Sequence, residues 1–213
     1  PTPSMPAVRM GISRWPYKPW RKVFYPKELP QHRELEFAAQ HFRSIELNGS
    51  FYSLQRPEYY ADWYGQTPRG FVFAVKGGRF ITHMKKLRAI DEALANFFAS
   101  GLLALRDKLG PVLWQFPENM PADLDRFAEF FAKLPRDTEQ AAALAKQHAA
   151  RLRGRSLVET DAKRRIRHAV EIRNRECATP QFIALLRRQR RRWVVAETGA
   201  AAERTSRHER WSG

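Results

Sequence analysis

The sequence predicts an α/β protein built around a parallel β-sheet. Strand-like apolar segments alternate with helix-like segments along the chain, which is typical of repeated βα units. Three strand-like segments, residues 44–48, 71–76 and 168–173, carry charged or amide side chains at or near their ends. Parallel strands are buried on both faces, so such groups are expected to gather where the strands end. No Gly-x-Gly-x-x-Gly or Walker-type loop follows a strand, which disfavours a nucleotide-binding open sheet.

Six segments have the composition of strands, and six have the spacing of helices. The expected strands are residues 8–13, 44–48, 71–76, 112–116, 169–172 and 193–197. The expected helices are residues 29–42, 58–66, 91–109, 123–134, 138–153 and 179–189, chosen from apolar positions that recur every three or four residues or from Ala-rich composition. Gly110 and Pro111 are expected to end the third helix, and residues 14–30 and 49–57 to form loops.

The composition predicts one domain with a substantial core. The chain has 213 residues, 43% of them hydrophobic, with six Trp. We expect a single domain at 8–197, a disordered tail at 1–7 and a poorly ordered tail at 198–213. The single Cys177 excludes an internal disulfide, and no signal peptide or membrane span is visible, so a soluble cytoplasmic protein is expected.

The positive charge is concentrated in one part of the chain. The net charge is +16, and residues 151–193 hold fourteen Lys or Arg against four Asp or Glu. Segment 151–192 could therefore contact the phosphates of a nucleic acid or another acidic surface. The competing interpretation is an Arg-rich helix face in water.

The charged strand ends predict an anion-binding site that can move protons. Glu46 and Asn48 are two residues apart and share one face of a strand, as do Glu171 and Arg173. The basic groups that follow the third strand suit a bound anion, and a histidine can transfer protons near neutral pH. The candidate catalytic residues are Glu46, Glu171 and His83. The candidate substrate-binding residues are Asn48, Lys76, Arg79, Gln115, Arg173, Tyr17 and Tyr52.

Each of these residues also has a structural interpretation. Glu46 could pair with Lys76, Glu171 with a neighbouring cation, and His83 could bond a loop carbonyl. The aromatic residues of the first loop could form a small core in place of a stacking surface. Glu46, Glu171 and Glu197 with His83 would suit a divalent metal, but their spacing is not a metal signature, so no metal site is assigned and the cofactor is unknown.

Several sequence blocks resemble one known family. They are Trp15-Pro16-Tyr17-Lys18-Pro19-Trp20, Glu46-Leu47-Asn48-Gly49-Ser50-Phe51-Tyr52, Phe73-Ala74-Val75-Lys76, Arg79-Phe80-Ile81-Thr82-His83, Gly110-Pro111-Val112-Leu113-Trp114-Gln115-Phe116-Pro117 and Ala169-Val170-Glu171-Ile172-Arg173. In this order they resemble the DUF72 (YecE-like) family, TIM-barrel proteins of unsettled function. The resemblance implies a TIM-type (β/α) barrel of which this chain has about six of eight βα units.

The chain departs from the family pattern in three places. The family's first loop resembles Gly-Trp-Ser-Tyr, where this chain has Arg14-Trp15-Pro16-Tyr17. Arg173 is followed by Asn174 and Arg175 where the family usually continues His-Pro-Ser-Trp, and the sixth strand ends in Glu197 where an Asp is typical. Beyond Gly199 no family motif is recognisable, and the last two strands have no counterpart. An incomplete barrel leaves two open sheet edges, so a homodimer that covers them is expected, or a protein of marginal stability.

Three functions remain open at this point. The first is an enzyme of the hydrolase or lyase type that acts on a phosphorylated or otherwise anionic small molecule at the end of the barrel where the strands finish. The second is a nucleic-acid or anion-binding protein without catalysis that uses segment 151–192. The third is a truncated, inactive family member.

Overall fold

The described part of the chain forms one parallel sheet with its strands in chain order. The computed structural model describes residues 9–189 and 191–194. The sheet order is β1-β2-β3-β4-β5-β6, and every neighbouring pair is parallel. The strands are β1 (Gly11–Ile12), β2 (Ser44–Leu47), β3 (Val72–Lys76), β4 (Leu109–Phe116), β5 (His168–Ile172) and β6 (Arg192–Val194). This confirms the α/β class with a parallel sheet.

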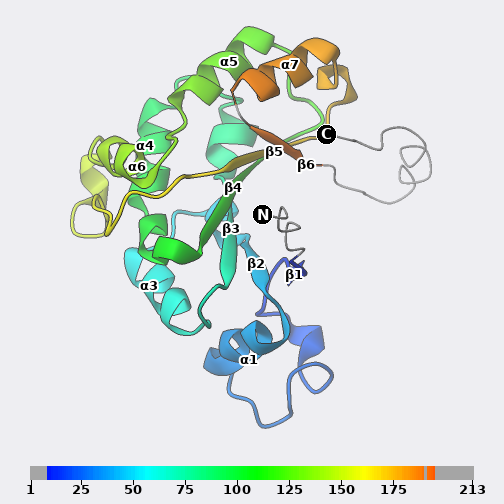
Figure 1. Ribbon diagram of the computed structural model, residues 1–213, viewed down its shortest axis with the longest axis vertical. Helices are drawn as coiled ribbons and strands as arrows, with labels where there is room; N and C mark the ends of the chain where they lie inside the picture. Colours follow the sequence, from blue (N-terminus) through cyan, green and yellow to red (C-terminus); the bar gives the residue numbers. More distant parts are fainter. Residues whose placement is uncertain (1–8, 190, 195–213) are drawn as a thin grey trace, which may run out of the picture.

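The helices of the later units cover one face of this sheet. They are α3 (Pro57–Gly65), α4 (Asp91–Ala99), α5 (Leu124–Lys133), α6 (Thr138–Ala145) and α7 (Pro180–Arg188). The earlier helices are α1 (Glu34–His41) and the short α2 (Gly49–Tyr52). Figure 1 shows α3, α4, α5, α6 and α7 following the outside of a curved sheet, with α4 packed on α6 and α5 on α7.

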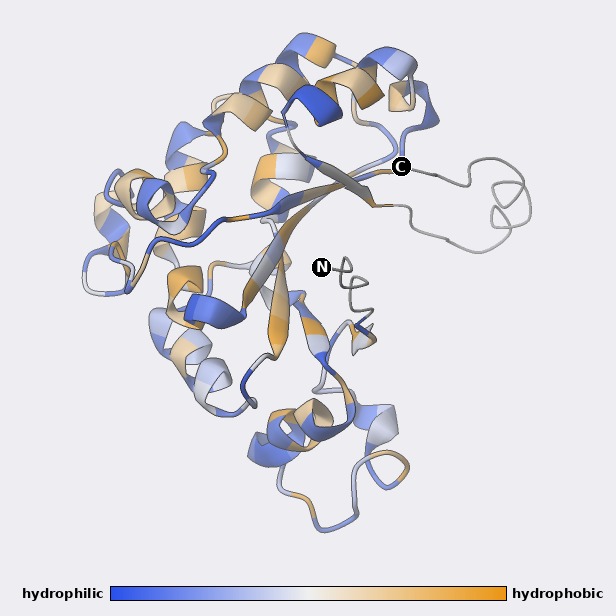
Figure 2. Cartoon of the chain, in the orientation of Figure 1, coloured by the Kyte–Doolittle hydropathy of each residue, from blue (hydrophilic) through white to orange (hydrophobic). Residues whose placement is uncertain are grey.

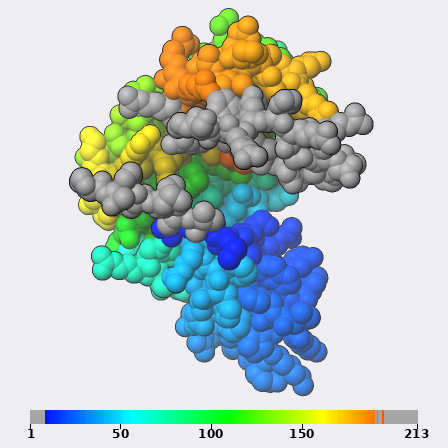
Figure 3. Space-filling model, turned by 45° about the vertical axis from the view of Figure 1, so that its right-hand side comes forward, coloured from blue at the N-terminus to red at the C-terminus, as the bar shows by residue number. Residues whose placement is uncertain are grey.

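The sheet is open. Within the described residues, β1 and β6 each pair on one side only, so the predicted barrel is not confirmed. A doubly wound, nucleotide-binding open sheet has a reversal in its strand order. The described sheet has none, so it is not of that kind. In Figure 3 the blue segment that contains α1 and the orange segment that contains α7 lie at opposite ends of the molecule.

The core lies between the sheet and its helices. Alternate residues of the strands face the helices and are almost completely buried, among them Ile45, Phe73, Val112, Trp114 and Val170. The strands in Figure 2 accordingly carry many hydrophobic residues, whereas the helices are hydrophobic on part of their surface only. Trp114 packs against Phe97 of α4 and Phe130 of α5, on the helix side of the sheet. The other set of alternate residues, which includes Glu46, lies on the opposite face.

Several predicted elements were wrong in extent. The helix expected at 91–109 ends at Ala99, because Gly101 has φ +111° and a 3₁₀ segment, Leu102–Lys108, follows it. Contrary to the expectation, Gly110 and Pro111 do not end a helix. They lie within β4, next to an irregularity in the β3–β4 register. A side chain at Gly110 would meet Val72 and the Phe73 carbonyl, so the close strand approach explains the glycine.

Two further segments differ from the expectation. The helix expected at 138–153 stops at Ala145, and the loop expected at 49–57 begins with the helical turn α2. Both differences arise from local turns that composition does not specify. The tails expected at 1–7 and 198–213 lie outside the described residues, as does the end of the sixth strand with Glu197.

Candidate site at the strand ends

The register of the sheet brings the predicted polar residues onto one face. Glu46 pairs with Ala74, and Lys76 lies two residues further along β3. Lys76 pairs with Leu113, and Gln115 lies two residues further along β4, where it pairs with Glu171. A shift of two residues keeps a side chain on the same face. We call the group Glu46, Asn48, Lys76, Arg79, His83, Gln115, Glu171 and Arg173 the strand-end site.

Glu171 is the most firmly held residue of the strand-end site. It is 6% exposed, and the Gln115 side-chain Nε2 donates to both of its oxygens at 2.8 and 2.9 Å. Arg173 Nε donates to the same carboxylate at 3.2 Å. The ion pair that the structural interpretation predicted for Glu171 is therefore present. Both oxygens are occupied, which suits an orienting role better than proton transfer.

Glu46 has no such partner. Within the described residues no cation lies at salt-bridge distance from Glu46, so the predicted Glu46–Lys76 ion pair is not formed. Burial raises the pKa of the Glu46 carboxyl, Lys76 lowers it, the nearby Glu171 raises it, and Asn48 lowers it. Asn48 also donates to the Ser13 carbonyl at 2.5 Å, which ties the end of β2 to the end of β1. A partly buried carboxyl whose pKa is raised holds its proton more tightly than a free carboxyl does, which suits a proton donor.

His83 lies close to the cations of the strand-end site. Burial lowers the pKa of His83, and Arg173, Arg79 and Lys76 lower it further, against a smaller opposite effect of Glu171. Its Nδ1 lies 2.8 Å from Thr82 Oγ1, and its ring packs edge-on against Phe51 at 5.1 Å. The ammonium of Lys76 lies over the same Phe51 ring at 4.9 Å. The loop that carries His83 is a π-helical turn, Phe80–Met84, a distortion that often occurs at functional sites.

The two tyrosines lie elsewhere. Tyr17 contacts Trp20 at 5.5 Å and the Arg14 guanidinium at 5.5 Å, within the first loop. Tyr52 is 69% exposed and lines a separate groove with Phe80 and Asn96. The structure therefore does not group either tyrosine with Glu46 and His83.

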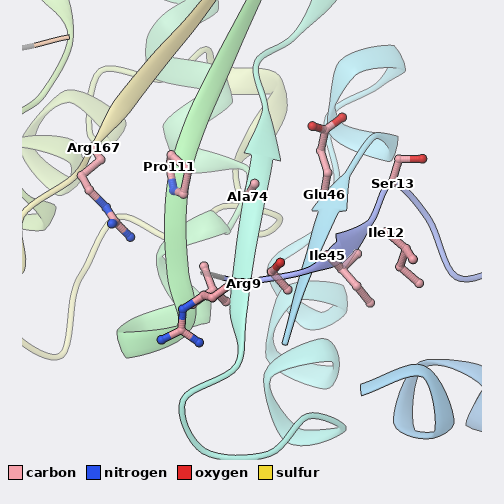
Figure 4. Close-up of a pocket in the computed structure, with 11 residues that line it drawn as sticks. Arg9, Ile12, Ser13, Ile45, Glu46, Ala74, Pro111 and Arg167 are labelled. Atoms are coloured by element: carbon pink, nitrogen blue, oxygen red, sulfur yellow. The ribbon is translucent and has the colours of Figure 1, made fainter. Parts of the chain in front are cut away.

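A cavity of about 540 Å³ opens beside Glu46 on the same face of the sheet. Figure 4 shows the Glu46 carboxylate and Ser13 at one end, and the guanidinium groups of Arg9 and Arg167 toward the other. Arg9 and Arg167 were not predicted as site residues. Their sequence signal is weak, because each is simply a cation just before a strand. The cavity is not lined by Lys76, Gln115 or Glu171.

In the described ranges no group of three or more His, Cys, Asp or Glu side chains is arranged to hold a metal ion. Over the same residues no helix combines the length and the apolar character needed to cross a bilayer.

Comparison with known proteins identifies relatives of the chain. The model of a family described as "Protein of unknown function DUF72" matches residues 9–211, which extends the match beyond Gly199, where no motif was recognised. The chain is similar to the UPF0759 protein YecE of Escherichia coli K12, with 26% identity over 59% of this chain and 51% of that protein. It is also similar to the UPF0759 protein YunF of Bacillus subtilis 168, with 29% identity over 52% of this chain and 40% of that protein.

Two solved structures share the fold. Both are of a DUF72 family protein from Enterococcus faecalis V583, with TM-scores of 0.55 and 0.58 and identities of 17% and 18%. The matches cover 88% and 89% of this chain but 61% and 60% of those chains. The chain also spans only about half the length of the curated relatives it matches.

Proposed function

This chain belongs to the DUF72 family of proteins of unknown function, and we propose that it is an enzyme acting on an anionic, phosphate-bearing small molecule at the strand-end site. One observation carries the proposal. His83 and the Lys76 ammonium lie against the same Phe51 ring, at 5.1 and 4.9 Å, and Glu46 lies on the same face of the sheet as Lys76. Proton donors and acceptors grouped with cations are the minimum that hydrolysis or elimination of an anionic substrate requires.

The roles follow from the contacts. Lys76, Arg79 and Arg173 attract the anionic group, and Gln115 and Glu171 hold Arg173 in place. His83 is uncharged near neutral pH because its pKa is lowered, so it can accept a proton. In the described residues its Nε2 makes no hydrogen bond, which leaves this atom for the substrate. Glu46, whose pKa is raised, supplies a proton to the leaving group.

Ligand binding tests the first half of the proposal. Thermal melting is measured with inorganic phosphate and a panel of phosphate monoesters. A ligand present at a hundred times its dissociation constant stabilises the fold by about 2.7 kcal/mol, or roughly 5–10 °C in Tm. The double variant Lys76→Met/Arg79→Gln should lose this shift, and the charge-matched variant Arg69→Gln/Arg88→Gln should keep it. An equal shift in both variants would contradict binding at the strand-end site.

Turnover measurements test the catalytic part of the proposal. Phosphate release or elimination is followed for each ligand that raises the Tm. Glu46→Gln should keep the Tm shift but lower the rate by about 10²-fold or more, the usual contribution of a general acid. If Glu46→Gln reacts as fast as the unaltered protein, Glu46 is not the acid and the catalytic proposal fails while the binding proposal stands.

We further propose that the six strands form an arc of a (β/α) barrel whose open edges pair with a second copy of the chain. The consecutive parallel order supports the arc, and the one-sided pairing of β1 and β6 within the described residues supports an edge partner. Light scattering after size-exclusion chromatography should give the mass of a dimer. A monomer at micromolar concentration would contradict the second copy.

A further inference from the structure

A second polar cavity lies at the opposite end of the sheet, where β5 and β6 begin. Its volume is about 680 Å³. Its lining comes from three segments that are distant in the sequence: the residues after α5, the residues before β5, and the end of α7 with the approach to β6. Figure 1 shows α5 and α7 side by side next to these two strands. We call its cations Arg136, Lys163, Arg165, Arg188 and Arg191 the basic pocket.

The walls of the basic pocket are fixed to one another by the backbone. Asp137 and Arg165 form an antiparallel bridge. The Ile166 amide donates to the Arg136 carbonyl at 2.9 Å, and the Thr138 amide donates to the Arg164 carbonyl at 2.9 Å. These bonds hold Arg136 and Arg165 on adjacent extended segments. The backbone positions from which the Arg136 and Arg165 side chains extend are therefore fixed relative to each other before any ligand binds.

The charge of the basic pocket is not balanced from within. Lys163 is paired with Glu139 at 2.8 Å and lies 3.9 Å from Asp137. Within residues 9–189 and 191–194, no carboxylate is at salt-bridge distance from the guanidinium groups of Arg136, Arg165, Arg188 or Arg191. Asp137 also lines the cavity, but its carboxylate lies nearest to Lys163, so four guanidinium groups share the cavity without a carboxylate paired to any of them in the described residues.

Arg191 shows that this imbalance extends into the interior. The residue is only 8% exposed, and its Nη2 donates to the backbone carbonyls of Phe131 and Leu134 at 2.7 and 3.5 Å. Its Nε is buried and has no hydrogen-bond partner. Burial, and then the nearby Arg136, lowers the pKa of Arg191 to about 10. A buried guanidinium without a carboxylate is costly, so a structure that keeps it gains from an anion bound beside it.

We infer that the basic pocket binds a short chain of linked phosphates, such as a tripolyphosphate group, through Arg136, Arg165 and Arg188 in front of the buried Arg191. Guanidinium groups bind phosphate oxygens in pairs, and several uncompensated guanidinium groups match several neighbouring phosphates. Ile166 is the apolar lining residue, and the described lining has no aromatic side chain on which a base could stack. The ligand is therefore recognised by its phosphates and not by a nucleobase. This inference is independent of the strand-end site.

Calorimetric titration with inorganic tripolyphosphate tests the inference. The unaltered chain should bind it, and the triple variant Arg136→Gln/Arg165→Gln/Arg188→Gln should bind at least about tenfold more weakly, since one charge-assisted hydrogen bond alone is worth that factor. These three side chains are exposed, so the variant should keep its fold, which circular dichroism checks. The control variant Arg43→Gln/Arg69→Gln/Arg153→Gln removes the same charge from other exposed positions and should bind as the unaltered chain does.

The remaining arm identifies the source of the phosphates. A single-stranded oligothymidylate should bind more weakly than tripolyphosphate at equal salt. If the oligonucleotide binds more tightly, or if both triple variants lose affinity equally, the pocket is not a polyphosphate site and the inference is overturned.

Discussion

The strand-end site and the basic pocket each contain a buried charged side chain, but the protein stabilises the two charges in different ways. At the strand-end site, Glu171 is 6% exposed and receives hydrogen bonds from Gln115 and Arg173. At the basic pocket, Arg191 is 8% exposed and is held by two backbone carbonyls, with no carboxylate beside it in the described residues. The first charge is neutralised by the protein itself. The second leaves a positive field that an external anion can neutralise.

The largest expected effect concerns His168, a buried histidine close to Arg191. His168 opens β5 near Arg191, and it accepts a hydrogen bond from Trp114 Nε1 at Nδ1 over 3.0 Å while its Nε2 lies 2.7 Å from the Pro135 carbonyl. Burial, and then Arg191, lowers the pKa of His168 to about 3. The folded protein therefore keeps a neutral imidazole at a pH where the unfolded chain, with a pKa near 6.5, is protonated.

Stability should consequently fall as the pH decreases below about 6.5, by roughly 2.3 kcal/mol between pH 6.5 and 4.5 from this residue. Urea unfolding at a series of pH values measures the slope, and His168→Gln should remove this part of it. Identical slopes for the two proteins would mean that the imidazole is not held neutral in the folded state.

A smaller effect tests the strand-end site, where the protein itself neutralises the buried charge of Glu171. Gln115→Leu removes two hydrogen bonds from the buried Glu171 carboxylate and leaves it with Arg173. The free energy of unfolding should fall by about 2 kcal/mol, the cost of a buried polar group that loses its partner. The double variant Gln115→Leu/Glu171→Leu should recover much of this loss, because both partners are then apolar. If Gln115→Leu costs nothing in urea unfolding, the hydrogen bonds do not compensate for the burial of Glu171.

The smallest effect concerns Glu46, a partly buried carboxyl that no cation neutralises at salt-bridge distance within the described residues. Its pKa is raised, so the folded state binds its proton more tightly than the unfolded state does, and stability is lost as the pH rises from the unfolded pKa through the folded one. Glu46→Gln removes that loss and should raise the free energy of unfolding at pH 7 by about 0.5–1 kcal/mol. The exposed control Glu118→Gln should change it by less. A clear destabilisation by Glu46→Gln would show that the carboxylate has a structural partner.

Elements with one dominant local signal could be predicted from the sequence. The apolar runs of β2, β3 and β5 identified these strands to within one residue, and Thr179 and Asp123 marked the starts of α7 and α5, where both side chains cap the helix. Elements with two competing signals were misplaced. Gly110 and Pro111 normally interrupt regular structure, yet here the close approach of β3 requires them inside a strand.

The residues of the candidate site were likewise predicted well where one local pattern marked them, and poorly where none did. Strand periodicity alone put Glu46 and Asn48, and Glu171 and Arg173, on shared faces, and these residues are part of the strand-end site. Tyr17 and Tyr52 were chosen for their residue type, and the structure places them apart from it. Arg9 and Arg167 line the cavity beside Glu46, although nothing in their sequence neighbourhood marks them.

The sequence by itself determined the α/β class, the positions of most strands and the polar residues at their ends, because these depend on hydrophobic periodicity over a few neighbouring residues. Only the tertiary structure decided which charges are neutralised. Gln115 reaches Glu171 across 56 positions of the chain, and Arg191 reaches the Phe131 carbonyl across 60. The energy of a buried charge depends on partners brought together by folding, and such partners have no fixed spacing in the sequence.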